Sequence, residues 1–176
     1  MALKDDFYRA TGKKKNNWWA FFTNRGLRYV CYLRILNNRS LFFLHPLIFL
    51  SRVILSRKAG IDIPAKTKIG NGFRIVHAFN IAINSAAILG KNVNIFKGAT
   101  IGFSGGKRRG TPIIGDNVQI GINSTVIGGI TIGDDVLIAP NTFVNFDVPS
   151  HSIVLGSPGV IIRKEDATQN YVCFRV

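Results

Sequence analysis

The sequence predicts an all-β solenoid preceded by a short, partly helical segment. Three observations support this: an aliphatic residue recurs every six positions, turn-forming residues follow it, and a second apolar series runs two residues before it. A period of six fits neither the helical repeat of about 3.6 residues nor the alternation of a half-buried strand. The chain must therefore turn after every few residues and point one aliphatic side chain inward each time.

The first series, the inner ladder, consists only of Ile, Leu and Val. Its register shifts by two residues after Ile81, and by a longer step after Ile101. Its members are Ile63, Ile69, Ile75, Ile81, Ile83, Leu89, Ile95, Ile101, Ile114, Ile120, Val126, Ile132, Ile138 and Val144. We expect these side chains to form one continuous core.

Turn residues and a second apolar series accompany the inner ladder. Glycine follows it directly at Gly70, Gly90, Gly102, Gly115, Gly121 and Gly133, and Asn or Asp comes shortly after. These residue types tolerate tight and left-handed backbone conformations. The second series is Phe73, Phe79, Val93, Val118, Ile130, Val136 and Val148. Because side chains alternate along a strand, each repeat is predicted to be a short strand and a corner.

The N-terminal segment, residues 1–58, is basic and aromatic. Residues 1–60 hold 12 Lys and Arg against only Asp5 and Asp6, and the cations interleave with Trp, Phe and Tyr. Such a mixture suits an anionic membrane surface. The apolar run from Leu41 to Leu55 is broken by His45 and Arg52, and it is shorter than the roughly 20 residues that span a bilayer. We expect it to pack on the solenoid or a neighbouring subunit, or to contact the membrane surface; the two are compatible.

Composition argues against several other classes. The pI of about 10.4 is typical of nucleic-acid-binding proteins, but the charge lies on an apolar segment without a binding motif, so no nucleic acid is expected. Cys31 and Cys173 stand at opposite ends and indicate neither a metal site nor a disulfide framework. The first 15 residues lack the apolar stretch of a cleavable signal peptide. We expect a cytoplasmic protein, peripheral at the inner face of the membrane.

Four motifs occur along the hexads: GIDI at 60–63, His77, a loop after Gly102, and VLGSPG at 154–159. In this order they resemble the hexapeptide-repeat acyltransferases, and within them the serine acetyltransferase-like group. The resemblance covers residues 60–163. It implies a left-handed parallel β-helix of triangular section, with three hexads per coil, assembled as a homotrimer. The left hand rests on the resemblance alone, because general rules favour right-handed crossovers.

We therefore divide the chain into the N-terminal segment 1–58, a β-helix acyltransferase domain 59–162 with a loop at 103–112, and a C-terminal tail 163–176. The loop, FSGGKRRGTP, is rich in Gly and cations and lies outside the hexad register. An isolated insertion into a regular solenoid usually serves binding, although a tolerated surface insertion is the alternative. We expect the loop to contact substrate through Lys107, Arg108, Arg109 and Thr111.

The resemblance also implies the reaction: direct transfer of acetyl from acetyl-CoA to a hydroxyl, without a metal. A neutral alcohol is a weak nucleophile, so a base must remove its proton during attack. His77 matches the family's catalytic histidine, and Asp62 matches the carboxylate that orients it. Taken alone, His77 is a surface or packing residue and Asp62 a turn residue, but the GIDI motif favours catalysis. His45 and His151 are weaker candidates.

The family holds CoA through backbone groups at successive coil corners and through basic residues at the phosphates. The matching positions are Gly121, Ile122, Ala139, Pro140, Gly156, Pro158, Arg163 and Lys164. Gly102 and the amides of the following loop are expected to stabilise the oxyanion. Small residues at corners also have a purely structural explanation.

The acceptor is where the sequence departs from true serine acetyltransferases. Those carry an acid before the catalytic histidine and an Arg-His pair before the proline that closes the loop, whereas this chain has Val76, Gly110 and Thr111. An amino-acid acceptor needs charged partners for both its groups. We therefore expect a sugar hydroxyl in capsular, exopolysaccharide or cell-envelope glycan biosynthesis. Serine O-acetylation, as in cysteine biosynthesis, is the alternative, and a non-catalytic trimeric scaffold is a third.

Overall fold

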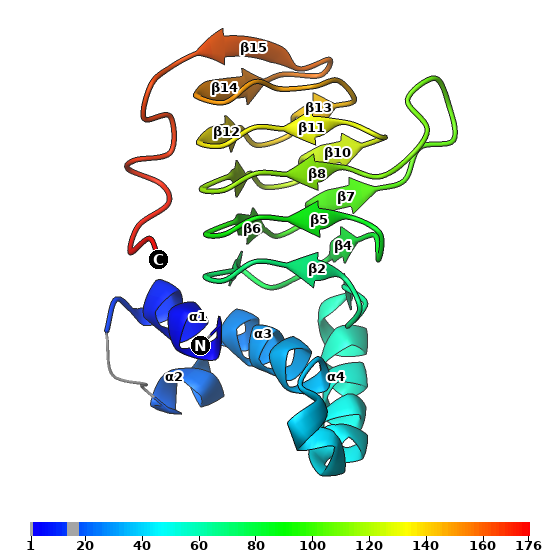
Figure 1. The fold of residues 1–176 in the computed structure, drawn as a ribbon, viewed down its shortest axis with the longest axis vertical. Coiled ribbons are helices and arrows are strands. Elements are labelled where there is room, and N and C mark those ends of the chain that lie inside the picture. Colours follow the sequence, from blue (N-terminus) through cyan, green and yellow to red (C-terminus); the bar gives the residue numbers. More distant parts are fainter. Residues whose placement is uncertain (1, 14–17) are drawn as a thin grey trace.

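The computed structural model describes residues 2–13 and 18–176 and places a group of helices at one end of a column of β-strands (Figure 1). Lys14 and Lys15 of the basic segment lie outside the described residues. The helices are α1 (Ala2–Thr11), α2 (Trp18–Thr23), α3 (Arg25–Leu36), the 3₁₀ helix η1 (Arg39–Leu44) and α4 (His45–Ala59). The helical part ends where Gly60 adopts a left-handed conformation, and the first strand begins at Ile61.

The strands form three sheets, and each of the first four coils contributes one strand to every sheet, whereas the last coil contributes strands to only two of them. Sheet A contains β1 (Ile61–Asp62), β4 (Ile81–Ile83), β7 (Thr100–Gly102), β10 (Thr125–Ile127) and β13 (Phe143–Val144). Sheet B contains β2 (Lys68–Ile69), β5 (Ile88–Leu89), β8 (Ile113–Ile114) and β11 (Thr131–Ile132). Sheet C contains β3 (Arg74–Val76), β6 (Asn94–Phe96), β9 (Gln119–Ile120), β12 (Val136–Ile138), β14 (Ser152–Leu155) and β15 (Val160–Arg163).

Every strand pair is parallel except β14 with β15, which are antiparallel and end the column. Ala82 lies beside Thr100, and Thr125 lies beside Phe143, so a coil closes after three hexads. The turns define three corners, which we name by the sheets they connect: A–B, B–C and C–A. The predicted parallel β-helix with a helical N-terminal segment is confirmed.

The inner ladder forms the core. Its members are buried except Ile69, which is partly buried at the first coil. The second series is buried as well, with one exception: Phe79 is 55% exposed. The prediction fails there because His77 and Asn80 have positive φ, so the chain leaves the strand alternation and Ala78 takes the inward place. Phe79 instead lines a cavity beside His77.

Helices α1 and α3 close the open end of the first coil. The fully buried Arg9 donates to the carbonyl of Gly72 (3.1 Å) and to Oδ1 of Asn94 (2.7 Å). Asp6, also buried, accepts from Arg34 (2.8 Å) and from the Phe73 amide (3.0 Å). Burial raises the pKa of the Asp6 carboxyl, and the Arg34 guanidinium opposes this effect. These buried polar contacts fix α1 and α3 on the coil, so the start of α3 is held next to β3.

Helix α4 and η1 stay largely exposed. Of residues Ser40–Ala59 only Ala59 is buried, and Phe42 is 71% exposed. This 20-residue run is long and apolar enough, by length and composition, to cross a membrane. The prediction that the run is too short was therefore wrong, because η1 and α4 together extend past both ends of the apolar stretch. Pro46 does not end the helical run, since it stands in the first turn of α4.

Candidate active site

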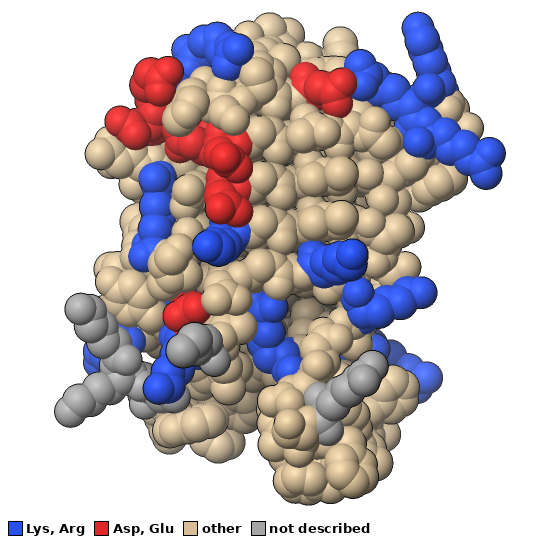
Figure 2. Space-filling view, in the orientation of Figure 1, with Lys and Arg blue, Asp and Glu red and all other residues tan. Residues whose placement is uncertain are grey.

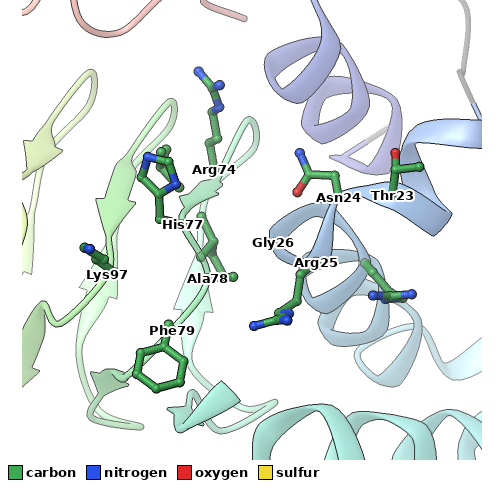
Figure 3. Close-up of a pocket in the computed structure, with 12 residues that line it drawn as sticks. Thr23, Asn24, Arg25, Gly26, Arg74, His77, Ala78, Phe79 and Lys97 are labelled. Carbon is green, nitrogen blue, oxygen red and sulfur yellow. The ribbon is translucent and has the colours of Figure 1, made fainter. Parts of the chain in front are cut away.

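His77 lies at corner C–A, directly after β3, and lines a cavity of about 780 Å³ between the first coils and α3 (Figure 3). Its side chain is exposed, and its ring centroid lies 6.4 Å from that of Phe96 in the next coil. The positive φ of 51° lifts the residue out of the strand. A histidine that lines a cavity, is open to solvent and is placed by a strained turn has the access that a general base needs.

The start of α3 forms the opposite wall. Asn24 caps the helix by accepting from the Leu27 amide (3.0 Å), and Gly26 packs directly against the Ile75 carbonyl. A Cβ at position 26 would overlap that oxygen, so glycine allows the helix to approach β3 closely. Figure 3 shows Arg25 extending from the helix, with His77 and Lys97 on the coil side.

The predicted CoA residues Gly121, Ile122, Ala139 and Pro140 lie at the same corner as His77. The register pairs Val76 with Phe96, Ile95 with Ile120 and Ile120 with Ile138, so Lys97, Ile122 and Pro140 stack above His77 in successive coils, and Gly121 and Ala139 lie one position earlier in the chain. Gly156 and Pro158 follow β14 at this corner of the last coil. A Cβ on Gly121 would lie 2.7 Å from the Ile138 carbonyl oxygen, so coil stacking alone explains that glycine.

The other predicted residues lie elsewhere in a single chain. Asp62 is exposed on β1, in sheet A, and within the described residues it makes no hydrogen bond to His77. Gly102 ends β7, and loop 103–112 leaves from corner A–B, where it projects from the column (Figure 1). Arg108 in that loop forms an exposed ion pair with Asp147 (2.6 Å). Lys107 and Arg108 line a smaller, separate cavity, while Arg109 and Thr111 lie in the same loop.

Arg163 and Lys164 lie at corner B–C, away from Gly156. Because β15 runs antiparallel to β14, Arg163 pairs with Ser152 at the start of β14. The Arg163 guanidinium donates to the Ser150 carbonyl (2.6 Å). His151 is beside them and contacts Asp135 (3.0 Å). Burial alone would raise the pKa of Asp135, but hydrogen bonds from Thr168, His151 and Ala167 hold it below its usual value. His151 therefore helps to fix the C-terminal tail on the β-helix.

Sequence reasoning missed four cations of the His77 cavity as a group: Arg25, Arg28, Arg74 and Lys97. The first two were counted only as part of the basic segment. The position of Lys97 beside His77 could have been predicted from the sequence, because Lys97 follows Ile95 by the same two positions that separate His77 from Ile75. No equivalent signal existed for α3, whose position depends on long-range contacts. Among the residues that the structure describes, no group of three or more metal-ligating side chains occurs.

Comparison with known proteins agrees with this architecture. A sequence profile of the family "Bacterial transferase hexapeptide (six repeats)" matches residues 111–145. Serine acetyltransferase 2 of Arabidopsis thaliana is 35% identical over 130 residues, which are 66% of this chain and 40% of that protein. A Staphylococcus aureus serine acetyltransferase is 41% identical over 108 residues, 60% of this chain and 50% of the relative. The chain thus spans half or less of the length of these curated relatives.

Solved structures give the same result. The crystal structure of Neisseria gonorrhoeae serine acetyltransferase superposes with a TM-score of 0.72 at 29% identity, covering 93% of this chain and 64% of that one. The soybean serine acetyltransferase apoenzyme gives a TM-score of 0.75 at 26% identity, with 92% and 67% covered. The left-handed parallel β-helix expected from the sequence is confirmed by this likeness. These comparisons confirm the resemblance to the hexapeptide-repeat acyltransferases, and within them to the serine acetyltransferase-like group.

Proposed function

We propose that the protein is an O-acetyltransferase that moves an acetyl group from acetyl-CoA directly to a hydroxyl. The observation that carries this proposal is the position of His77, in the wall of a cavity of about 780 Å³ and at the start of the corner column that contains Lys97, Ile122 and Pro140. Gly121 and Ala139, next to this column, have small side chains that leave room for an extended ligand. The acceptor enters from the cavity, and the thioester from the coils above.

In the proposed step, a ring nitrogen of His77 takes the proton of the acceptor hydroxyl while its oxygen attacks the thioester carbon. The tetrahedral intermediate collapses, the C–S bond breaks, and the imidazolium returns the proton to the leaving thiolate. Backbone amides near Gly102 would stabilise the oxyanion, and Asp62 would orient the histidine. Acetyl-CoA supplies the activated acyl group; Arg163 and Lys164 remain candidates for its phosphates.

A homotrimer would unite residues that one chain keeps apart. His77 lies at corner C–A, whereas Gly102 and loop 103–112 lie at corner A–B. In a closed threefold assembly of triangular columns, one corner of each copy can face a different corner of its neighbour. We propose that the loop of one subunit reaches the His77 cavity of the next, where Lys107 to Thr111 would contact the acceptor.

L-Serine is the acceptor that the comparisons favour, since the relatives and the solved structures named above are serine acetyltransferases. The expectation of a glycan hydroxyl finds no support among them. We therefore propose serine first. The glycan remains a second candidate on one observation: Val76, Gly110 and Thr111 stand where the family's charged serine-binding residues would be.

The two acceptors can be separated by measuring the release of CoA thiol from acetyl-CoA with L-serine and with cell-envelope sugars. We expect turnover of serine at low millimolar concentration. If the protein acetylates sugars but not serine, the glycan becomes the first candidate for the acceptor and serine the second. A wild-type protein that neither binds acetyl-CoA nor releases thiol with any acceptor would instead favour the non-catalytic scaffold.

We also propose that η1 and α4 contact an anionic membrane surface. The exposed apolar face of these helices comprises Phe42, Phe43, Leu47, Phe49, Leu50 and Ile54. No Asp or Glu occurs between Phe7 and Ile61, so the surrounding charge is positive. Figure 2 shows carboxylates gathered over the upper coils and almost none over the helical end in that view. Two copies meeting through this face would bring cations together, which favours lipid over a second chain.

Replacing both Phe42 and Phe49 with serine should weaken binding to phosphatidylglycerol-containing vesicles at least about tenfold, because each buried phenyl ring contributes roughly 1.5–3 kcal/mol. Vesicle co-sedimentation measures the change. Leu155→Ser is the matched control, since Leu155 is 42% exposed at the opposite end of the column. Equal binding to neutral vesicles would contradict the electrostatic part, and resistance to alkaline extraction from cell membranes would indicate a spanning helix instead.

A further inference from the structure

The cavity beside His77 is lined by four cations and by no carboxylate among the described residues. Arg25 and Arg28 come from α3, Arg74 comes from β3, and Lys97 follows β6. The ion pairs in the described part of the chain join other residues: Arg34 with Asp6, Arg108 with Asp147, His151 with Asp135 and Glu165, and Arg175 with Asp135. The positive charge around His77 is therefore not neutralised within the cavity, and it would attract an anion.

These cations surround the space where an acceptor would bind. Arg25 reaches in from α3, whereas Lys97 stands with His77 on the coil side (Figure 3). A cavity of about 780 Å³ is large enough for an acceptor whose hydroxyl is at His77 and whose other end meets the arginines. Arginine is suited to this task because its planar guanidinium binds carboxylate and phosphate oxygens in pairs.

We infer that this cavity binds an oxyanion, a carboxylate or phosphate, on the acceptor that is acetylated, using Arg25, Arg28, Arg74 and Lys97. The inference rests on the proposed function and narrows its substrate class. Because no acid lines the described cavity, a positively charged group on the acceptor finds no partner there. The preferred acceptors are then small hydroxylated anions. L-Serine qualifies through its carboxylate, and its ammonium group contributes nothing to recognition.

Three acceptors of similar size test this inference: L-serine, 3-hydroxypropionate, which lacks the ammonium, and ethanolamine, which lacks the carboxylate. We expect 3-hydroxypropionate to match or exceed serine in kcat/KM, and ethanolamine to fall at least about tenfold below both. Glycerol 3-phosphate compared with glycerol shows whether phosphate can replace the carboxylate. If ethanolamine or glycerol is acetylated as efficiently as the anions, the inference is wrong, although the acetyltransferase activity itself is then still supported.

Binding of inorganic phosphate gives a readout that does not need activity. Phosphate should raise the melting temperature of the wild type, and Arg25→Gln and Arg74→Gln should each weaken phosphate binding roughly tenfold or more. Lys91→Gln, which removes an exposed cation outside the cavity, is the control. Burial and the neighbouring Arg74 guanidinium lower the pKa of Arg9 to about 10, so Arg74→Gln also removes a like-charge repulsion and should leave the fold intact.

Failure of the anion site and failure of the proposed reaction give different experimental results. If phosphate binds and depends on Arg25 and Arg74 but no acceptor releases thiol, the anion site stands and the proposed reaction is wrong. If thiol release is robust but both variants keep the wild-type KM for 3-hydroxypropionate and the wild-type affinity for phosphate, the reaction stands and the anion site is wrong. Arg25→Lys provides a further check, because it keeps the charge and should recover part of the lost affinity.

Discussion

Replacing His77 with alanine should lower the rate of acetyl transfer about a hundred- to ten-thousandfold, the usual effect of removing a general base. The acceptor hydroxyl would then have to lose its proton to water while it attacks the thioester. Acetyl-CoA should still bind, because its proposed contacts at Gly121 and Ala139 lie in higher coils. Thiol release at saturating substrates measures the rate, and calorimetric titration measures the affinity for acetyl-CoA.

His151→Ala is the matched control for this experiment. His151 is also a histidine of positive φ, but its ring contacts Asp135 at corner B–C and not the cavity. We expect this variant to keep its activity near that of the wild type and to lose some stability at the C-terminal tail. A His77→Ala protein with full thiol release and a genuine acceptor would show that another group removes the proton, and equal losses in both variants would indicate a general effect on folding.

The coils could be predicted from the sequence because their signal is local and repeated. A strict six-residue period, with a turn residue after each aliphatic position, leaves few structures that bury every member of the inner ladder. The same regularity placed His77 at one corner with Ile122 and Pro140, since residues at one hexad position stack at one corner. Phe79 was the exception, because the positive φ at His77 interrupts the alternation on which its prediction depended.

The cavity itself could not be predicted, because one of its walls comes from α3. That helix is held against β3 by contacts between residues far apart in the sequence, such as Arg9 with Asn94, and by the close approach at Gly26. Neither leaves a periodic pattern. The alternative locations of the apolar run were also undecided from the sequence, since an apolar helix looks the same whether it covers a coil or remains exposed, as η1 and α4 do.

Replacing Ile120 with alanine should lower the free energy of unfolding by about 2–5 kcal/mol, a large part of the roughly 5–15 kcal/mol that stabilises a typical domain. Ile120 is fully buried in the middle coil, between Ile95 on one side and Ile138 on the other. Its truncation leaves a cavity that the two neighbouring coils cannot fill without moving their own backbone hydrogen bonds. Because each coil of a solenoid is stabilised by its neighbours, a defect in the middle weakens both contacts at once.

The conservative variant Ile120→Val separates lost packing from other causes. It removes one methylene and keeps the β-branched shape, so the loss should be only about 0.5–1.5 kcal/mol. Urea denaturation followed by circular dichroism measures both variants, and a constant m-value would show that the same surface is exposed on unfolding. A graded loss from valine to alanine is the result expected of a dry, close-packed core. An alanine variant as stable as the wild type would mean that the inner ladder does not carry the stability of the column.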